Sequence, residues 1–293
     1  MIKGSMQTRP LFSVLIANYN NGRFLQEAID SVLAQTYTNW EIILVDDASI
    51  DNSLELYKEL EQDGRIHIYY NEQNQGCGYT KRRCAELANG EICGFLDPDD
   101  QLLPEALDKH VLVHESRPDV SVVYSRCYYC NYKGEVTGEN RLLNLNSGET
   151  YFDYRWYGAM HLASYKNEYY KRTEGISNVI KAGVDQDLYF KIEEVGNAFV
   201  LNEFTYKYYN RNENAITKND ARLWFWNLEV RRAACERRKL DVNTILCDDL
   251  KYIFNAVKED ASYETELQIR SSRPYRLGKL LLKPFSWIKG KFV

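Results

Sequence analysis

The sequence predicts an α/β fold in which helices flank a mainly parallel sheet, followed by a helical C-terminal extension. Three observations predict it. Short apolar runs alternate with amphipathic segments over residues 12–114. The fourth of these runs, 92–96, is continuously apolar, as expected of a central parallel strand. After residue 219 the chain becomes mainly helical in pattern. We therefore divide the chain into a larger domain, 10–219, and an extension, 220–293.

The first half of the predicted sheet uses three strands, at 12–17, 41–45 and 65–70. A helix is expected between the first two, because apolar residues there are spaced along one helical face: Leu25, Ala28, Ile29, Val32 and Leu33. Asp51 and Asn52 offer caps for a second helix that carries Leu54, Leu56, Tyr57 and Leu60. Both helices therefore connect parallel strands.

The second half begins with a helix at 79–88, which Asn89 and Gly90 end. The strand at 92–96 follows, and Pro104 opens a helix that runs to about residue 114. Beyond Val123 the alternation weakens into a tyrosine-rich region with turns at 133–134 and 147–148. Periodicity returns at Asp185, which begins a helix that we expect Gly196 to end.

Composition excludes several classes of protein. The net charge of −5 and the pI near 5.6 argue against a surface built for nucleic acid. Seven cysteines without regular spacing favour reduced thiols and a cytoplasmic location. Cys127 and Cys130 form a lone CxxC in a strand-like run, so we interpret them as buried structural thiols. His110 and His114 have metal-ligand spacing, but their helix leads away from the ligand edge, so we interpret them as ordinary histidines.

Acidic residues follow two of the predicted strands. Asp46 and Asp47 come after 41–45, and Asp97 comes after 92–96. In an open parallel sheet, ligands bind at the carboxyl ends of the strands. A cluster of carboxylates there is costly unless a cation is bound, and Mg²⁺ or Mn²⁺ prefers such oxygen ligands. The sequence therefore predicts a divalent cation that in turn holds a diphosphate.

Four motifs in this order resemble glycosyltransferase family 2. They are Ser13-Val14-Leu15-Ile16-Ala17-Asn18-Tyr19-Asn20, Val45-Asp46-Asp47-Ala48-Ser49, Asn74-Gln75-Gly76 and Phe95-Leu96-Asp97-Pro98-Asp99-Asp100. The resemblance covers about residues 10–217. It implies the GT-A fold, a nucleotide-sugar donor, an inverting mechanism and a divalent cation.

The resemblance also implies roles for individual residues. Ala17, Tyr19 and Asp47 match positions that line the pocket for base and ribose, with Asp46 beside them. Asp99 matches the direct metal ligand, and Asp97 matches the residue that bonds the ribose or reaches the metal through water. Asp185 matches the general base, and His161 matches a histidine near the acceptor. An ordinary half-buried histidine remains the alternative for His161.

This sequence departs from the family pattern at three places. Lys81 stands in the stretch that often contains arginine; it would supply positive charge near the diphosphate, but without the bidentate fork of a guanidinium. Val184 replaces a glutamate that commonly precedes the base. Asn212 replaces a histidine, which puts in doubt a metal or phosphate contact there.

The parts together predict a metal-dependent inverting transfer from a nucleotide-diphosphate sugar, with UDP the preferred nucleotide, to an acceptor hydroxyl in cell-surface polysaccharide or other glycan assembly. A degenerate nucleotide-sugar-binding module is the non-enzymatic alternative, because of Val184 and Asn212. A sugar-1-phosphate nucleotidyltransferase should carry a glycine-rich basic loop after the first strand, which 18–22 does not resemble. A nicotinamide dehydrogenase should carry GxGxxG there.

The C-terminal tail, 270–293, interleaves basic with apolar and aromatic residues and has no acidic residue. This pattern is typical of a segment on an anionic membrane face. We expect a cytoplasmic protein that contacts the inner face of the membrane through this tail and acts on a glycan or lipid-linked glycan, which flotation with liposomes can test. Packing of the tail on its own domain or on a second subunit, as in a homodimer, is the alternative.

Overall fold

The computed structural model describes residues 9–140, 145, 149–153, 161–209 and 220–259. The chain forms two compact units, 1–213 and 214–293. The boundary predicted between 219 and 220 adjoins residues 210–219, which lie outside the described part. So do the tail 270–293, the turn at 147–148 and Asn212.

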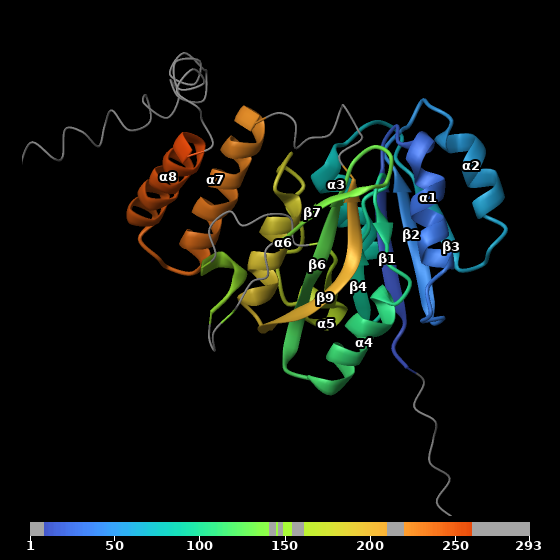
Figure 1. Cartoon of the computed structure of the whole chain (residues 1–293), viewed down its shortest axis with the longest axis horizontal. Helices are drawn as coiled ribbons and strands as arrows, with labels where there is room; N and C mark the ends of the chain where they lie inside the picture. The colour runs from blue at the N-terminus through green and yellow to red at the C-terminus, as the bar shows by residue number, and fades with distance from the viewer. Residues whose placement is uncertain (1–8, 141–144, 146–148, 154–160, 210–219, 260–293) are drawn as a thin grey trace, which may run out of the picture. The chain divides into compact units, whose positions relative to one another are not determined.

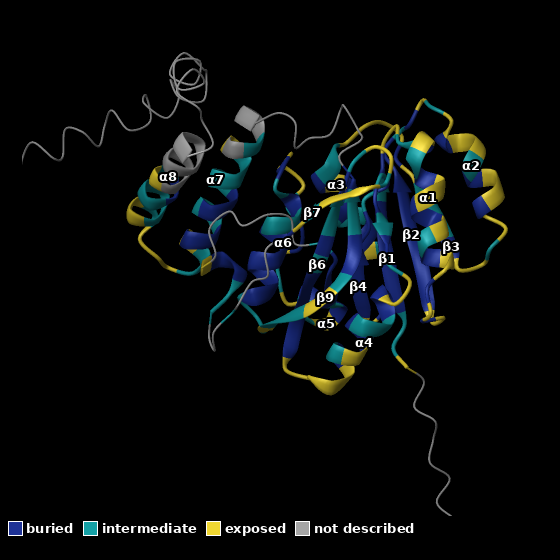
Figure 2. Cartoon of the chain, viewed as in Figure 1, coloured by how far each residue is buried: buried dark blue, intermediate teal, exposed yellow. Residues whose placement is uncertain are grey.

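Within the described residues of the first unit, nine strands form one mixed sheet in the order β3-β2-β1-β4-β8-β6-β9-β5, with β7 beside β6 (Figure 1). Four strands are parallel neighbours: β3 (Ile66–Tyr70), β2 (Trp40–Asp46), β1 (Phe12–Asn18) and β4 (Ile92–Phe95). These are the four predicted strands. The apolar runs of β1, β2 and β4 are almost entirely buried (Figure 2), whereas β3, at the end of the sheet, is mostly half-buried.

The other half of the sheet mixes directions. β8 (Ala163–Lys166) runs antiparallel to β4 and to β6 (Val120–Cys130), whereas β9 (Asn197–Tyr209) runs parallel to β6. β5 (Gln101–Leu102) pairs with β9, and β7 (Val136–Glu139) forms a hairpin with β6 through the predicted turn at 133–134. Cys127 and Cys130 lie buried in β6, and neither is part of a disulfide.

Helices cover both faces of the parallel half. One buried cluster joins alternate residues of β1 and β2 to α1 (Gly22–Leu33), α2 (Ser53–Leu60) and α4 (Ala106–Ser116). α3 (Cys77–Leu87) contacts β1 and β2, and its Cys84 and Ala85 are buried. Because successive strand residues point to opposite faces, α3 covers the other face. Because α3 connects β3 to the parallel strand β4, its N-terminus lies at the carboxyl ends of the strands.

The described residues of the first unit contain three further helices: η1 (Tyr151–Asp153), α5 (Asn167–Tyr170) and α6 (Val184–Glu193). α6 matches the helix expected from Asp185, although it ends before Gly196. The second unit contains α7 (Asp220–Arg237) and α8 (Val242–Glu259), which pack together around a buried ion pair between Arg231 and Asp249.

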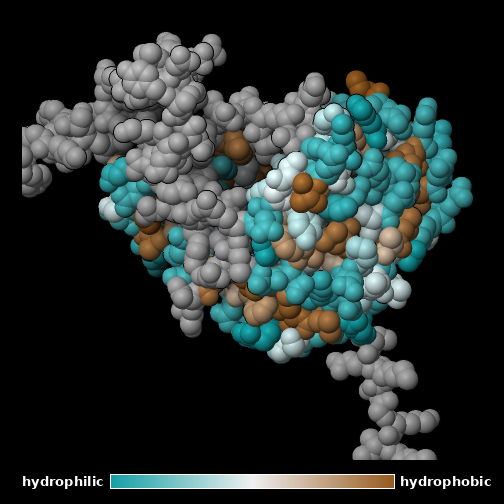
Figure 3. Space-filling model, in the orientation of Figure 1, coloured by the Kyte–Doolittle hydropathy of each residue, from teal (hydrophilic) through white to brown (hydrophobic). Residues whose placement is uncertain are grey.

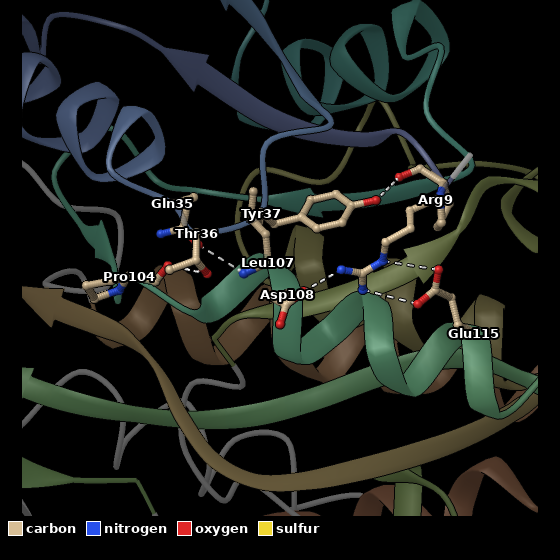
Figure 4. A network of polar contacts seen from close by, with 9 residues as sticks. Arg9, Gln35, Thr36, Tyr37, Pro104, Leu107, Asp108 and Glu115 are labelled. Atoms are coloured by element: carbon tan, nitrogen blue, oxygen red, sulfur yellow. Dashed lines mark hydrogen bonds and ion pairs between the residues drawn. The ribbon is translucent and has the colours of Figure 1, made fainter. Parts of the chain in front are cut away.

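The amino-terminal edge of the sheet is tied to α4 by polar contacts (Figure 4). Arg9 makes ion pairs of 2.7 Å with Asp108 and 3.1 Å with Glu115. The Tyr37 hydroxyl donates to the Pro10 carbonyl oxygen at 2.5 Å. Arg9 and Pro10 precede β1, so these contacts lie at the edge opposite the predicted ligand site, and we assign them to the stability of the fold.

The surface of the described first unit is mostly hydrophilic where α1 and α2 face the viewer, with apolar residues scattered among polar ones (Figure 3). Scattered apolar side chains are ordinary on a folded surface. In the part of the chain that the structure describes, no helix is both long enough and apolar enough to span a membrane.

Candidate active site

Asp46 is the last residue of β2 and Asp47 follows it, and both are almost completely buried. The Asp46 carboxylate accepts hydrogen bonds from the Tyr57 hydroxyl at 2.6 Å and from the backbone N–H of Ser49 at 2.8 Å. Ala48 between them adopts a left-handed φ of 62°, which non-glycine residues rarely do. Asp46 therefore holds a strained turn at the end of the strand.

The Asp47 carboxylate organises the loop that precedes α3. It accepts hydrogen bonds from the Asn71 side-chain amide at 2.7 Å and from the backbone N–H groups of Gln75 and Gly76, both at 2.8 Å. Gly76 has a φ of 89°, where a side chain would be strained. Its neighbours Asp47 and Asn71 thus shape the loop from which α3 begins.

The end of β1 brings in the other residues predicted to contact the nucleotide. Ala17 is half-buried in β1, and Tyr19, just after the strand, is 45% exposed. Asn18 between them donates hydrogen bonds to Tyr57 at 2.7 Å and to Ser53 at 3.0 Å, which tie β1 to α2. This role of Asn18 could not be predicted from the sequence pattern. Tyr19 is left on the surface beside the buried Asp46 turn.

The acidic run after β4 divides into two parts. Asp97 and Asp99 are partly exposed, whereas Asp100 is buried. The Asp100 carboxylate accepts hydrogen bonds from the Tyr206 hydroxyl at 2.9 Å and from the Tyr209 backbone N–H at 2.7 Å, both in β9. Burial raises the pKa of Asp100 well above its ordinary value, and the negative charges of Asp99 and Asp97 raise it further. Asp100 therefore anchors the turn that presents the other two.

Lys81, in α3, links two of the predicted site residues. Its Nζ lies 3.0 Å from Asp97 Oδ1 and 2.8 Å from Asp185 Oδ1. Burial disfavours the Lys81 ammonium, but Asp185 and Asp97 outweigh it and raise the pKa of Lys81 well above its ordinary value. Burial likewise opposes ionisation of Asp97, yet Lys81 holds the Asp97 pKa below its ordinary value. Both carboxylates are therefore within hydrogen-bond distance of one cation.

Asp185 reaches Lys81 because of how α6 begins. Gly183 precedes the helix with a left-handed φ of 69°, and Asp185 lies in the first helical turn. A carboxylate there is stabilised by the helix dipole. The chain between β8 and α6 therefore carries Asp185 back to the carboxyl edge of β4.

His161 lies at the same edge because β8 runs antiparallel to β4. β8 begins where β4 ends, and His161 precedes it by two residues. The imidazole stacks on Tyr206 and Tyr208, with ring centroids 5.1 and 5.4 Å apart. Burial lowers the pKa of His161 although Asp97 and Asp185 favour its charged form. The structure thus gathers His161, Lys81, Asp97 and Asp185 in one region.

His110 and His114 lie elsewhere, on the face of α4 that packs against the sheet. Their ring nitrogens, Nδ1 of His110 and Nε2 of His114, lie 2.7 and 2.9 Å from the Ser164 hydroxyl oxygen of β8. Burial lowers the pKa of each ring from 6.5 to about 3. Their interpretation as ordinary buried histidines agrees with these bonds.

This pair predicts a pH dependence of stability. Below pH 6.5 both rings take up protons in the unfolded chain, whereas in the folded protein they stay neutral down to about pH 3. As the pH is lowered from 6.5 toward 3, the free energy of unfolding should therefore fall by up to about 1.4 kcal/mol per histidine for each pH unit. Urea unfolding at several pH values should give a flatter dependence for a His110→Gln/His114→Gln variant. Equal slopes in both proteins would contradict the assignment.

A pocket of about 460 Å³ opens at the opposite edge of the sheet. Gly90, Lys166 and Lys171 are among its lining residues. None of the residues predicted to bind donor, metal or acceptor lines it. The predicted site residues lie instead at the carboxyl ends of β1, β2 and β4.

Residues 13–174 match the family model described as Glycosyl transferase family 2. The chain belongs to glycosyltransferase family 2. This match ends before Asp185, so the assignment of that residue depends on geometry and on the sequence motif.

The chain is also similar to individual relatives in sequence and to solved structures in fold. This family 2 member is 26% identical to the chondroitin synthase of Escherichia coli over 259 residues, which is 86% of this chain and 37% of that synthase. S. aureus TarS 1–349 in complex with UDP-GlcNAc matches with a TM-score of 0.68 at 18% identity, covering 87% of this chain and 77% of that one. The chain thus spans little more than a third of the synthase.

A second solved structure is the mannosyltransferase PcManGT from Pyrobaculum calidifontis in complex with GDP-Man and Mn²⁺. It matches with a TM-score of 0.59 at 17% identity over 92% of this chain and 83% of that one. At sequence identities this low, the structural similarities are evidence for the fold alone. They confirm the predicted GT-A fold.

The residues of this family 2 member fit a hard divalent cation. Asp97 and Asp99 present carboxylate oxygens beside Pro98, and both are partly exposed. The described residues contain no group of three or more His, Cys, Asp or Glu side chains that would form a closed metal cage. Mg²⁺ commonly binds through one or two carboxylates together with substrate phosphates and water. Two partly exposed carboxylates are compatible with that open type of site.

Proposed function

We propose that this chain is an inverting glycosyltransferase that moves a sugar from a nucleotide-diphosphate sugar to an acceptor hydroxyl. The observation that carries the proposal is the position of Lys81, whose ammonium contacts both Asp97, at the proposed diphosphate end, and Asp185, the proposed base. Donor activation and proton removal must occur on opposite sides of one anomeric carbon, so both groups are needed in one region.

We propose a role for each site residue on this basis. Ala17, Tyr19, Asp46 and Asp47 form the nucleotide end, where Tyr19 offers an exposed ring and the two acids hold the surrounding loops. Asp99, assisted by Asp97, would hold Mn²⁺ or Mg²⁺. When bound, that cation supplies neutralising charge to the diphosphate. His161 and its tyrosine stack form the acceptor side.

The proposed reaction is a single displacement. Asp185 takes the proton of the acceptor hydroxyl as its oxygen forms a bond to the anomeric carbon. The bond from that carbon to the phosphate oxygen breaks, and its electron pair leaves with the nucleoside diphosphate. Configuration inverts because attack and departure occur on opposite faces. No covalent intermediate on the protein is required.

We further propose a UDP-sugar donor and a role in polysaccharide assembly. Support comes from the TarS complex with UDP-GlcNAc and from the E. coli relative, which is a chondroitin synthase. PcManGT was solved with GDP-Man, so GDP-sugars are the alternative donors. A glycan or a lipid-linked glycan is the proposed acceptor.

Calorimetric titration with UDP and with GDP, in Mn²⁺ or in EDTA, tests the donor end. We expect UDP to bind in Mn²⁺ and to bind more weakly in EDTA. An Asp99→Asn variant should bind UDP in Mn²⁺ only as well as the native protein does in EDTA, because a neutral amide is a poorer ligand for a hard cation. Asp119→Asn, which alters an exposed carboxylate beside β6, is the matched control.

Release of UDP from a panel of UDP-sugars, measured with and without glycan acceptors, then tests the enzyme. Sugar-dependent release supports the proposal. UDP binding without any release or transfer would favour the nucleotide-sugar-binding module instead. Failure of both nucleotides to bind would contradict both proposals.

A further inference from the structure

One face of α3 contacts the segment that leads to Asp185. A Cβ built on Gly78 would lie 2.5 Å from the Ile180 carbonyl oxygen and 2.6 Å from that of Ser177. Arg82 Nη1 donates to the Ile176 carbonyl oxygen at 3.1 Å. Positions 78, 81 and 82 share one helical face because they are three and four residues apart. The same face therefore holds both the approach to α6 and Asp185 itself.

Lys81 is the buried charged group on this face. Its side chain is only 6% exposed, whereas those of Asp97 and Asp185 are 29% and 28% exposed. The ammonium also lies 5.0 Å from the ring centroid of Phe95, the last residue of β4. A buried ammonium is stable only when it is paired, and two of its three N–H groups have carboxylate acceptors here. The cation is therefore more enclosed than either of its partners.

Besides the positive charge that the sequence predicts near the diphosphate, Lys81 supplies a contact to the proposed base. Here Nζ donates to Asp185 Oδ1 at 2.8 Å, across 104 positions of sequence. The contact fixes one oxygen of a carboxylate that stands on the first turn of a short helix.

We propose that Lys81 is a positioning residue for the general base: it holds Asp185 Oδ1 against α3 and Asp97, so that Oδ2 faces the acceptor hydroxyl. The proposal rests on the proposed function, because it takes Asp185 as the base. Asp97 joins the same ammonium to the donor end, which sets the distance between base and donor. A displacement of a reacting group by about 1 Å can cost about 10²-fold in rate, which is the size of effect expected.

The first test is a double-mutant cycle on transfer kinetics with Lys81→Met, Asp185→Asn and the double variant. A positioning role predicts that Lys81→Met lowers kcat by about 10²-fold while the donor KM changes by less than about 3-fold. It also predicts that the double variant is no slower than Asp185→Asn alone, because Lys81 acts through Asp185. A rise in donor KM with little loss of kcat, or losses that multiply in the double variant, would overturn it.

Lys109→Met is the matched control, since Lys109 of α4 also pairs with two carboxylates, Glu105 just before α4 and Glu203 in β9. It should leave both kinetic constants unchanged. A loss of kcat in Lys109→Met equal to that in Lys81→Met would mean that removing any paired lysine harms the protein, and would overturn the specific role of Lys81.

Amide hydrogen exchange supplies a readout that does not depend on activity. Exchange in residues 176–187 should be faster in Lys81→Met than in the native chain, and unchanged in Lys109→Met. Unchanged exchange in Lys81→Met overturns the positioning role even if transfer is lost. Faster exchange in a chain that never transfers sugar would support the tether and contradict the proposed function, so the two failures are distinguishable.

Discussion

Asp185→Asn is expected to slow sugar transfer by about 10²- to 10⁴-fold, the usual contribution of a general base. Asparagine has nearly the same shape, and its carbonyl oxygen can still accept the hydrogen bond that Lys81 Nζ makes to Asp185 Oδ1 at 2.8 Å. It cannot take a proton from the acceptor hydroxyl at neutral pH. Initial rates at saturating donor and acceptor measure the effect.

The control for this prediction is nucleotide binding. Asp185 lies at the acceptor end of the proposed site, so UDP affinity by calorimetry should stay within about 3-fold, about 0.7 kcal/mol, of the native value. Asp119→Asn, the same change at an exposed carboxylate, should leave the rate unaltered. If Asp185→Asn kept more than a third of native activity, the assignment of the base would have to be abandoned.

Lys191→Met is expected to destabilise the first unit by about 3–5 kcal/mol. Lys191 and Asp187 are one turn apart on α6, with side chains 6% and 2% exposed and an Nζ to Oδ2 distance of 2.7 Å. Nζ also donates to the Gly175 carbonyl oxygen at 2.9 Å. Removing the lysine leaves a buried carboxylate without its cation, and urea unfolding measures the cost.

A second variant separates this cause from lost packing. Asp187→Leu/Lys191→Met removes both charges, and replacing a buried ion pair by apolar residues is often nearly neutral, so it should recover most of the lost stability. Arg172→Met breaks the exposed pair with Glu168 and should cost less than about 1 kcal/mol. A double variant as unstable as Lys191→Met would contradict the ion-pair explanation.

The parallel half of the sheet could be predicted from the sequence because its strands are apolar runs with clear helices between them. The other half could be predicted only in part: the strand-like run around Cys127 and Cys130 corresponds to β6, but the strands that pair with it were not expected. β8 has four residues and β5 has two, too few to show a period. β9 pairs with β6 through several register shifts, which break the alternation of buried and exposed residues. Pairing with distant strands, rather than local pattern, fixes these elements.

Some residues of the candidate site could likewise be predicted from the sequence, and others could not. The acidic run after β4 could be found because its position relative to a buried strand is local information. The buried role of Asp100 could not, because its partners Tyr206 and Tyr209 are more than a hundred residues away. The contact of Lys81 with Asp185 could not be predicted either, because 104 positions of sequence separate the two residues. Long-range ion pairs leave no periodic trace in a sequence.

The glycine at position 78 has a consequence for how the protein can vary and move. With no side chain between them, the backbone of α3 rests directly on the carbonyl oxygens of Ser177 and Ile180. Because no side chain lies at this contact, a shift of the helix at the nucleotide end would displace Asp185 without being absorbed by rotamer changes. The nucleotide end and the base of the proposed site would therefore move together, and an alanine at position 78 would break this coupling by separating α3 from the segment before Asp185.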